Sequence, residues 1–128
     1  MKSRGLTVAE MNVLSAYIPQ VDLGNAVLHI GHVPWYLPRR FGAIVRGNDI
    51  YFRPGVYAEG TALGLALLGH ELTHVGQYRT GMTAVRYLCS AMRGYRNSRY
   101  EKAAYGVQAR ILGDLGDAIK TAGMRHDE

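Results

Sequence analysis

Cysteine is almost absent from this sequence, which has only Cys89 among its 128 residues. A lone cysteine cannot form an intramolecular disulfide, and the lack of further cysteines excludes the Cys-rich zinc fingers. Any metal bound by this chain must therefore be held by His, Asp or Glu side chains. The chain is also too short for two hydrophobic cores, so we expect residues 1–128 to form a single domain.

Long apolar runs are missing as well. No stretch approaches the roughly 20 residues that a transmembrane helix needs. The first four residues have the basic character of a signal peptide, but Glu10 and Asn12 interrupt any apolar segment behind them. We therefore expect a soluble protein without a Sec signal peptide, cytoplasmic in the cell that produces it.

Acidic residues are outnumbered by basic ones, and the formal net charge is +5. Arginines cluster at positions 39–40 and at 93, 96 and 99. Such clusters can attract nucleic acid, an anionic envelope surface or an acidic partner. A solvated basic surface is the more common origin of this charge. No nucleic-acid-binding motif accompanies it, so we expect no specific nucleic-acid partner.

Apolar spacing and turn residues divide the chain into helices and short strands. The predicted helices cover residues 6–18, 61–79, 83–94 and 98–122. The predicted strands cover residues 26–33, 43–45 and 49–53, and Gly47-Asn48 joins the last two as a hairpin. This order predicts an α+β fold with an N-terminal helix, a small antiparallel sheet and then three helices.

Residues 70–74 read His-Glu-Leu-Thr-His and lie within the predicted helix 61–79. On a helix, His70 and His74 project from one face about one turn apart. Two imidazole nitrogens can then reach one Zn²⁺ at about 2.0–2.1 Å. Glu71 would lie beside the metal and could accept a proton from a metal-bound water. Chance would give this motif in roughly 0.7% of shuffled sequences of this composition, which favours a zinc site over two unrelated histidines.

A catalytic zinc needs a third protein ligand as well as an open position for water. Glu101 is the main candidate, because the chain between it and His74 is long enough to turn back. However, Ser98-Arg99-Tyr100-Glu101 also has the form of a capping box, in which Glu101 would bond the backbone N–H of Ser98. Spacing alone leaves both roles open. Weaker ligand candidates are His29, His32, Asp114, Asp117 and His126.

Three stretches of the chain look like parts of one family pattern. Residues 47–55 read Gly-Asn-Asp-Ile-Tyr-Phe-Arg-Pro-Gly, and residues 67–77 read Leu-Leu-Gly-His-Glu-Leu-Thr-His-Val-Gly-Gln. Residues 100–105 read Tyr-Glu-Lys-Ala-Ala-Tyr. Together they resemble the DUF4157 family, a metallopeptidase-like domain common in extracellular contractile injection systems and polymorphic toxins.

The resemblance implies a minimal zincin-like fold in which Glu101 is the third zinc ligand, as in gluzincins. Two positions depart from the pattern. Tyr105 stands where gluzincins often place an Asp that orients a zinc-bound histidine. Gly76 stands where the family usually has a larger residue.

The resulting hypothesis is a zinc metallopeptidase in which Glu71 is the general base. A developing oxyanion needs a hydrogen-bond donor. Tyr105 is the first choice, one turn beyond Glu101, and Tyr100 and Tyr95 are alternatives. The strand 49–53 could pair with an extended substrate.

The substrate would be a protein or peptide. The chain would act on it as an effector or toxin domain of a secretion system, delivered by a contractile or type VI apparatus. A cognate immunity or delivery protein would be a further partner. Two alternatives remain: a regulatory zincin that cleaves one intracellular partner, and a catalytically weak or inactive adaptor or cargo domain that acts through protein contacts.

Overall fold

The computed structural model describes residues 2–83 and 98–126, with side chains described up to residue 116. The predicted helix 83–94 and Cys89 lie outside the described residues. The described part has helices and a small four-stranded sheet, which confirms the α+β prediction. No helix in these two ranges is long and apolar enough to cross a membrane.

The sheet is mixed, so the predicted purely antiparallel arrangement is wrong. Its strands are β1 (Lys2–Arg4), β2 (Val27–Ile30), β3 (Ala43–Arg46) and β4 (Asp49–Phe52), in the order β1-β2-β4-β3. The predicted hairpin is the antiparallel β3–β4 pair, but β4 also lies parallel to β2. The reason is the connection through residues 31–42, which takes the chain to the outer edge of the sheet before the hairpin returns beside β2.

The predicted first helix, 6–18, is present in a shorter form, and a second helix that was not predicted follows it. Helix α1 (Val8–Leu14) begins with a capping box formed by Thr7 and Glu10. Helix α2 (Gln20–Asn25) has Pro19 as its N-cap residue. Proline has no N–H for the helical ladder, so it is tolerated at the start of a helix but stops one that approaches it from the N-terminal side.

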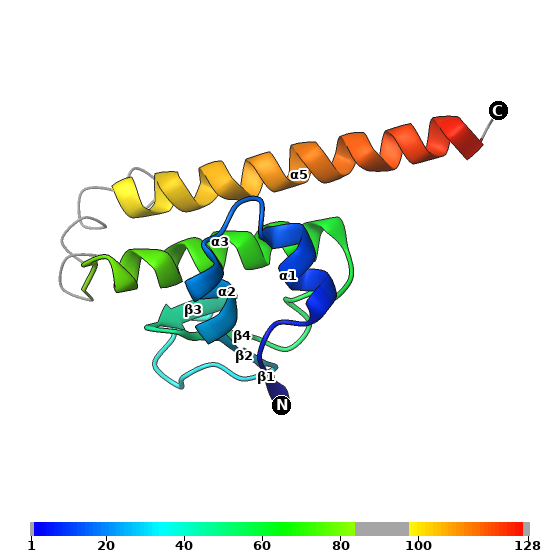
Figure 1. Ribbon diagram of the computed structural model, residues 1–128. Coiled ribbons are helices and arrows are strands. Elements are labelled where there is room, and N and C mark those ends of the chain that lie inside the picture. The colour runs from blue at the N-terminus through cyan, green and yellow to red at the C-terminus, as the bar shows by residue number, and fades with distance from the viewer. Residues whose placement is uncertain (1, 84–97, 127–128) are drawn as a thin grey trace.

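Two long helices form the upper part of the molecule. Helix α3 (Ala62–Arg79) lies between the sheet and helix α5 (Arg99–His126), and α3 and α5 run side by side in opposite directions (Figure 1). Thr61 caps α3 by accepting a hydrogen bond from the Gly64 N–H at 3.0 Å. Gly81 ends it with a φ of 119°, a conformation that favours glycine, and the Met82 N–H bonds the Gln77 carbonyl at 2.8 Å.

Small residues on α3 let its neighbours approach closely. A Cβ atom added at Gly69 would lie 2.2 Å from Ile111 Cδ1 of α5. A Cβ atom at Gly76 would lie 3.0 Å from Asp22 Oδ2 of α2. The Asp22 carboxylate is buried and accepts hydrogen bonds from Arg79 at 2.8 and 3.1 Å. Glycine at position 76 therefore leaves space for the ion pair that joins α2 to α3.

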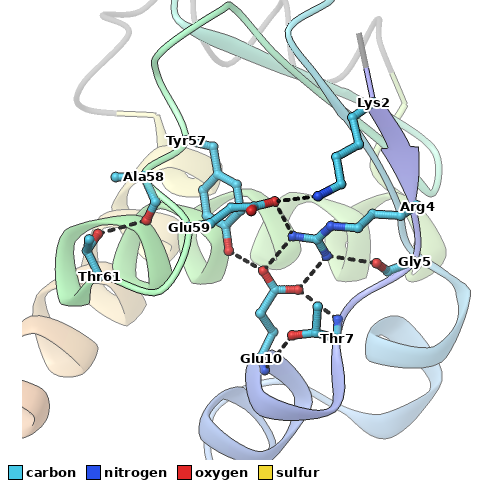
Figure 2. Close-up of polar contacts among 9 residues, drawn as sticks. All are labelled: Lys2, Arg4, Gly5, Thr7, Glu10, Tyr57, Ala58, Glu59 and Thr61. Carbon is cyan, nitrogen blue, oxygen red and sulfur yellow. Dashed lines mark hydrogen bonds and ion pairs between the residues drawn. The ribbon is translucent and has the colours of Figure 1, made fainter.

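An ion-pair cluster fastens the N-terminal strand to the segment before α3 (Figure 2). The Arg4 guanidinium donates to both carboxylate oxygens of Glu10, at 2.7 and 3.0 Å, and to Glu59 at 2.7 Å. The Tyr57 hydroxyl donates to Glu10 from the other side. Burial raises the pKa of Glu10, but the hydrogen bonds from Arg4, Tyr57 and Thr7 outweigh it and hold that pKa at about 2. The cluster therefore fixes β1, α1 and the start of α3 to one another.

Candidate metal centre

His70, His74 and Glu101 meet between α3 and α5. The two histidines lie one turn apart on α3, and Glu101 lies in the first turn of α5. Glu101 Oε1 is 2.6 Å from His74 Nε2, and Glu101 Oε2 is 3.5 Å from His70 Nε2. All three side chains are buried, and their possible ligand atoms lie within 4.8 Å of one another. The antiparallel packing of the two helices brings together residues that are far apart in the sequence.

The position of Glu101 bears on the two roles that its sequence spacing left open. Its carboxylate turns toward both histidines. Ser98 caps α5 through its own atoms: its hydroxyl accepts from the Tyr100 N–H at 3.3 Å, and its carbonyl accepts from the Lys102 N–H at 2.9 Å. Glu101 therefore belongs to a buried group of three side chains that could hold a metal ion.

A glutamine faces the other side of each imidazole. His70 Nδ1 lies 2.8 Å from Gln108 Oε1, and His74 Nδ1 lies 2.8 Å from Gln77 Oε1. The orientation of Gln77 is fixed, because its amide nitrogen donates to the Tyr100 carbonyl at 3.0 Å. An amide oxygen accepts a hydrogen bond from Nδ1–H, so Nε2 is the nitrogen of each ring that faces the centre and would ligate a metal after losing its proton.

The charges in this buried site are strongly coupled. Burial raises the pKa of Glu101, but the hydrogen bonds with His70 and His74 outweigh it and lower that pKa to about 2. Burial lowers the pKa of His74, but the hydrogen bonds to Glu101 and Gln77 and the negative charges of Glu71 and Glu101 together outweigh this effect, so the net direction is upward. The folded site therefore favours an ionised carboxylate beside a cation.

Glu71 projects into the same buried region beside its neighbour His70. Burial raises its pKa, the electrostatic influence of the neighbouring histidines lowers it, and the Glu101 carboxylate raises it again, with a net shift upward. Among residues 2–83 and 98–116, no side chain or backbone group forms a hydrogen bond with its carboxylate. Glu71 is therefore next to the three converging side chains without belonging to their group.

The proposed oxyanion donors occupy different environments. The Tyr105 ring packs edge-on against His70, with centroids 4.6 Å apart, and its side chain is 43% exposed. Tyr105 therefore marks where the centre approaches the surface. Tyr100 is buried, and its hydroxyl accepts a hydrogen bond from Arg99 at 2.7 Å. Tyr95 lies outside the described residues.

The weaker ligand candidates lie elsewhere. On the sheet, His29 bonds Ser3 and Asp49 and stacks on Tyr51, and His32 contacts the same tyrosine ring. Asp114 accepts a hydrogen bond from the Tyr17 hydroxyl. The side chains of Asp117 and His126 lie outside the described residues.

Two residues of the site, Gln77 and Gln108, were missed as partners of the histidines by the sequence interpretation. Gln77 follows His74 by three residues and therefore lies on the same face of α3. Gln108 follows Glu101 by seven residues, or two helical turns, and therefore lies on the same face of α5. That spacing was the available signal. It also explains how the site accommodates Tyr105 in place of the gluzincin aspartate, because Gln108 now holds His70.

The expected role of strand 49–53 in substrate pairing is wrong. Strand β4 lies inside the sheet, between β2 and β3, and both of its edges are paired. Strand β3 lies at the edge of the described sheet and contacts α3. An added strand would therefore have to pair with one of the two edge strands of the described sheet, β1 or β3, of which β3 is the one that contacts α3.

The donor set fits a metal ion. Two imidazole nitrogens and one carboxylate oxygen form a buried group with suitable spacing. Zinc accepts this combination of nitrogen and oxygen ligands in catalytic sites. These three side chains therefore meet the chemical requirement for binding a divalent ion.

Comparison with known families gives a match over part of the chain. Residues 38–82 match the family model of the eCIS core domain, from extracellular contractile injection systems. The matched segment includes β3, β4 and α3, with His70, Glu71 and His74, and it ends before Glu101. No curated protein and no solved structure matches the chain. The match confirms the family resemblance, whereas the place of Glu101 in the site rests on the geometry.

Proposed function

Because residues 38–82 carry the core domain of extracellular contractile injection systems, we propose that the protein is a zinc metallopeptidase domain of such a system. It would act as an effector that hydrolyses peptide bonds. The observation that carries this proposal is the convergence of Glu101 on His70 and His74, with Glu71 beside them.

His70, His74 and Glu101 would hold the zinc ion. When bound, zinc polarises a carbonyl group and lowers the pKa of water toward about 7. Gln77 and Gln108 keep the two imidazole rings in the tautomer and orientation that ligation requires. The protein therefore contributes both the donor atoms and the groups that align them.

Glu71 would act as the general base. It would take a proton from the attacking water and then deliver that proton to the leaving amine. Its place beside His70 keeps the carboxylate near the reacting atoms without using it as a ligand. Tyr105, at the exposed side of the same centre, would donate a hydrogen bond to the developing oxyanion.

The substrate would be a protein or peptide in extended form. Among the described residues, no strand pairs with the outer edge of β3, and β3 contacts α3, so this edge is where an extended substrate would pair. Delivery by the contractile system would bring the domain to its substrate, and a delivery or immunity protein would bind it before release.

The test is a comparison of the zinc-loaded wild type with Glu71→Gln and a matched Glu59→Gln control. Each protein is incubated with a denatured protein mixture, and new N-termini are identified by mass spectrometry. We expect cleavage by the wild type and by Glu59→Gln, whose carboxylate lies in the N-terminal ion-pair cluster. Glu71→Gln should bind zinc without cleaving.

Two outcomes would contradict the proposal. One is that zinc-loaded wild type releases no new termini. The other is that Glu71→Gln retains zinc and full biological activity, which would favour the adaptor or cargo function, in which protein contacts matter and turnover does not.

A further inference from the structure

The loop between β2 and β3 exposes the largest apolar side chain of the protein. Trp35 is 94% exposed and Tyr36 is 49% exposed, and their rings contact each other edge-on. Soluble domains bury most of the area of a tryptophan side chain. The loop lies away from the α3–α5 interface that holds the candidate metal centre (Figure 1).

The loop is braced, so the exposure of Trp35 belongs to a defined conformation. Two successive turns begin at prolines: the Leu37 N–H bonds the Pro34 carbonyl at 3.1 Å, and the Phe41 N–H bonds the Pro38 carbonyl at 3.0 Å.

A single guanidinium holds these turns from inside. Arg53, at the end of β4, donates to the carbonyls of Phe41 at 2.7 Å, Leu37 at 2.9 Å and Pro38 at 3.0 Å. Three carbonyl groups of the loop are thus tied to the sheet. The backbone is held while the two aromatic side chains project away from it.

The surroundings of the aromatic pair are basic. No Asp or Glu occurs from residue 23 to residue 48. Arg39, Arg40 and Arg46 in the same stretch are exposed. This part of the surface therefore complements a negatively charged partner.

Tryptophan and tyrosine prefer the interface between water and a lipid bilayer, where the ring meets the acyl chains and the polar atom stays hydrated. Nearby arginines add attraction to anionic headgroups. A projecting tryptophan needs a matching pocket in a protein partner, whereas a fluid bilayer accommodates it without one. The combination therefore favours a lipid surface.

We propose that residues 34–41 dock the protein on anionic lipid bilayers, with Trp35 and Tyr36 inserted at the interface and Arg39 and Arg40 on the headgroups. The buried surface is small, so binding is reversible. The inference concerns a surface separate from the metal centre and stands independently of peptidase activity.

The experiment uses Trp35 itself as the probe, because it is the only tryptophan in the chain. The full chain is titrated with vesicles of phosphatidylcholine containing phosphatidylglycerol, and with vesicles of phosphatidylcholine alone, in about 0.15 M salt. We expect a blue shift of the emission and quenching by brominated acyl chains with the anionic vesicles. The zwitterionic vesicles should give a much smaller response.

Two variants with equal loss of charge locate the binding surface. Arg39→Gln/Arg40→Gln should weaken partitioning about thirtyfold, since each arginine near an anionic surface contributes roughly a fivefold change. Lys102→Gln/Arg110→Gln removes the same charge from exposed positions on α5 and should retain most of the binding. Trp35 is 94% exposed, so Trp35→Ala should leave the fold intact. The variant should reduce co-sedimentation with the vesicles.

Three results would overturn the proposal. The first is an emission of Trp35 that does not change with anionic vesicles, which would point to a protein partner for the loop. The second is an α5 double variant that loses as much binding as the loop variant, which would indicate attraction by net charge alone. The third is a Trp35→Ala variant that co-sediments as well as the wild type, which would exclude insertion.

Discussion

The His70 Nδ1 atom lies 2.8 Å from Gln108 Oε1, so one face of α5 contacts the centre twice. The first turn of α5 supplies Glu101. Gln108, two turns later, orients His70, which Glu101 also faces. The position of α5 along α3 therefore sets both the donor atoms and their alignment.

Replacement of Gln108 by leucine should weaken zinc binding while preserving the fold. The leucine keeps the volume but cannot accept the His70 Nδ1 proton, so the ring loses its fixed orientation. Loss of such a partner typically lowers metal affinity about 10–100-fold. Competition with a chromophoric chelator measures the affinity. Gln20→Leu, at an exposed position on α2, is the control, and equal affinity in the two variants would contradict this role.

Gly69→Ala should separate α3 from α5. The new Cβ would meet Ile111 Cδ1 at 2.2 Å, and overpacking of this kind costs about 1–3 kcal/mol. The shift should also move Glu101 away from the histidines and weaken zinc binding. Gly113→Ala on α5 has nothing within 4 Å and should instead stabilise the helix by about 0.5–1 kcal/mol. Urea unfolding measures the stability of both variants. An unchanged free energy of unfolding in Gly69→Ala would contradict this prediction, because it would show that the helices can move apart without a loss of stability.

The ion-pair cluster in Figure 2 should make the free energy of unfolding depend on pH in the acid range. The pKa of Glu10 is about 2 in the folded protein, below its ordinary value of 4.5. Its stabilisation is therefore complete above about pH 4.5 and is lost as the pH falls toward 2, because the unfolded state binds the proton more readily. The full pKa shift corresponds to about 3 kcal/mol, and solvent screening at this partly buried site reduces the expected contribution to about 2 kcal/mol.

Glu10→Gln checks this acid dependence. The variant should be less stable near neutral pH and should show a flatter decline between pH 4.5 and 2 in chemical unfolding. Glu59→Gln removes a more exposed partner of Arg4 and should change the profile less. Parallel acid profiles for the wild type and Glu10→Gln would contradict the assignment.

Tyr105→Phe should separate binding from turnover if the protein is a peptidase. The ring would still pack on His70, so zinc content and KM should change little, while kcat should fall about 10²–10³-fold through loss of the oxyanion donor. Tyr51→Phe, on the sheet beside His29, is the matched control. An unchanged kcat in Tyr105→Phe would assign the ring to packing alone.

The parts of the fold predicted correctly from the sequence carry local signals. Thr61 and Gly81 mark the two ends of α3, and Gly47-Asn48 marks the hairpin turn; each acts within a few residues. The His70-Glu71-His74 spacing is local in the same way, since one helix determines it. Helical periodicity also located the buried stripe of α5 through Ala104 and Ile111.

The parts that were missed depend on residues far apart in the sequence. Strand β1 is only three residues long and polar, and it is a strand because it pairs with β2. The parallel pairing of β2 with β4 depends on the path of residues 31–42, which lead from β2 to β3. The choice between capping and ligand roles for Glu101 could not be made before α5 was placed against α3.

The most direct test of the metal centre is the zinc content of the purified protein, measured together with its melting temperature. The wild type and Glu71→Gln should each bind one zinc ion per chain and melt at a higher temperature with zinc than after chelation. His70→Ala, His74→Ala and Glu101→Ala should each lose the ion and the shift. Absence of zinc from the wild type, with no rise in melting temperature on zinc addition, would contradict the account.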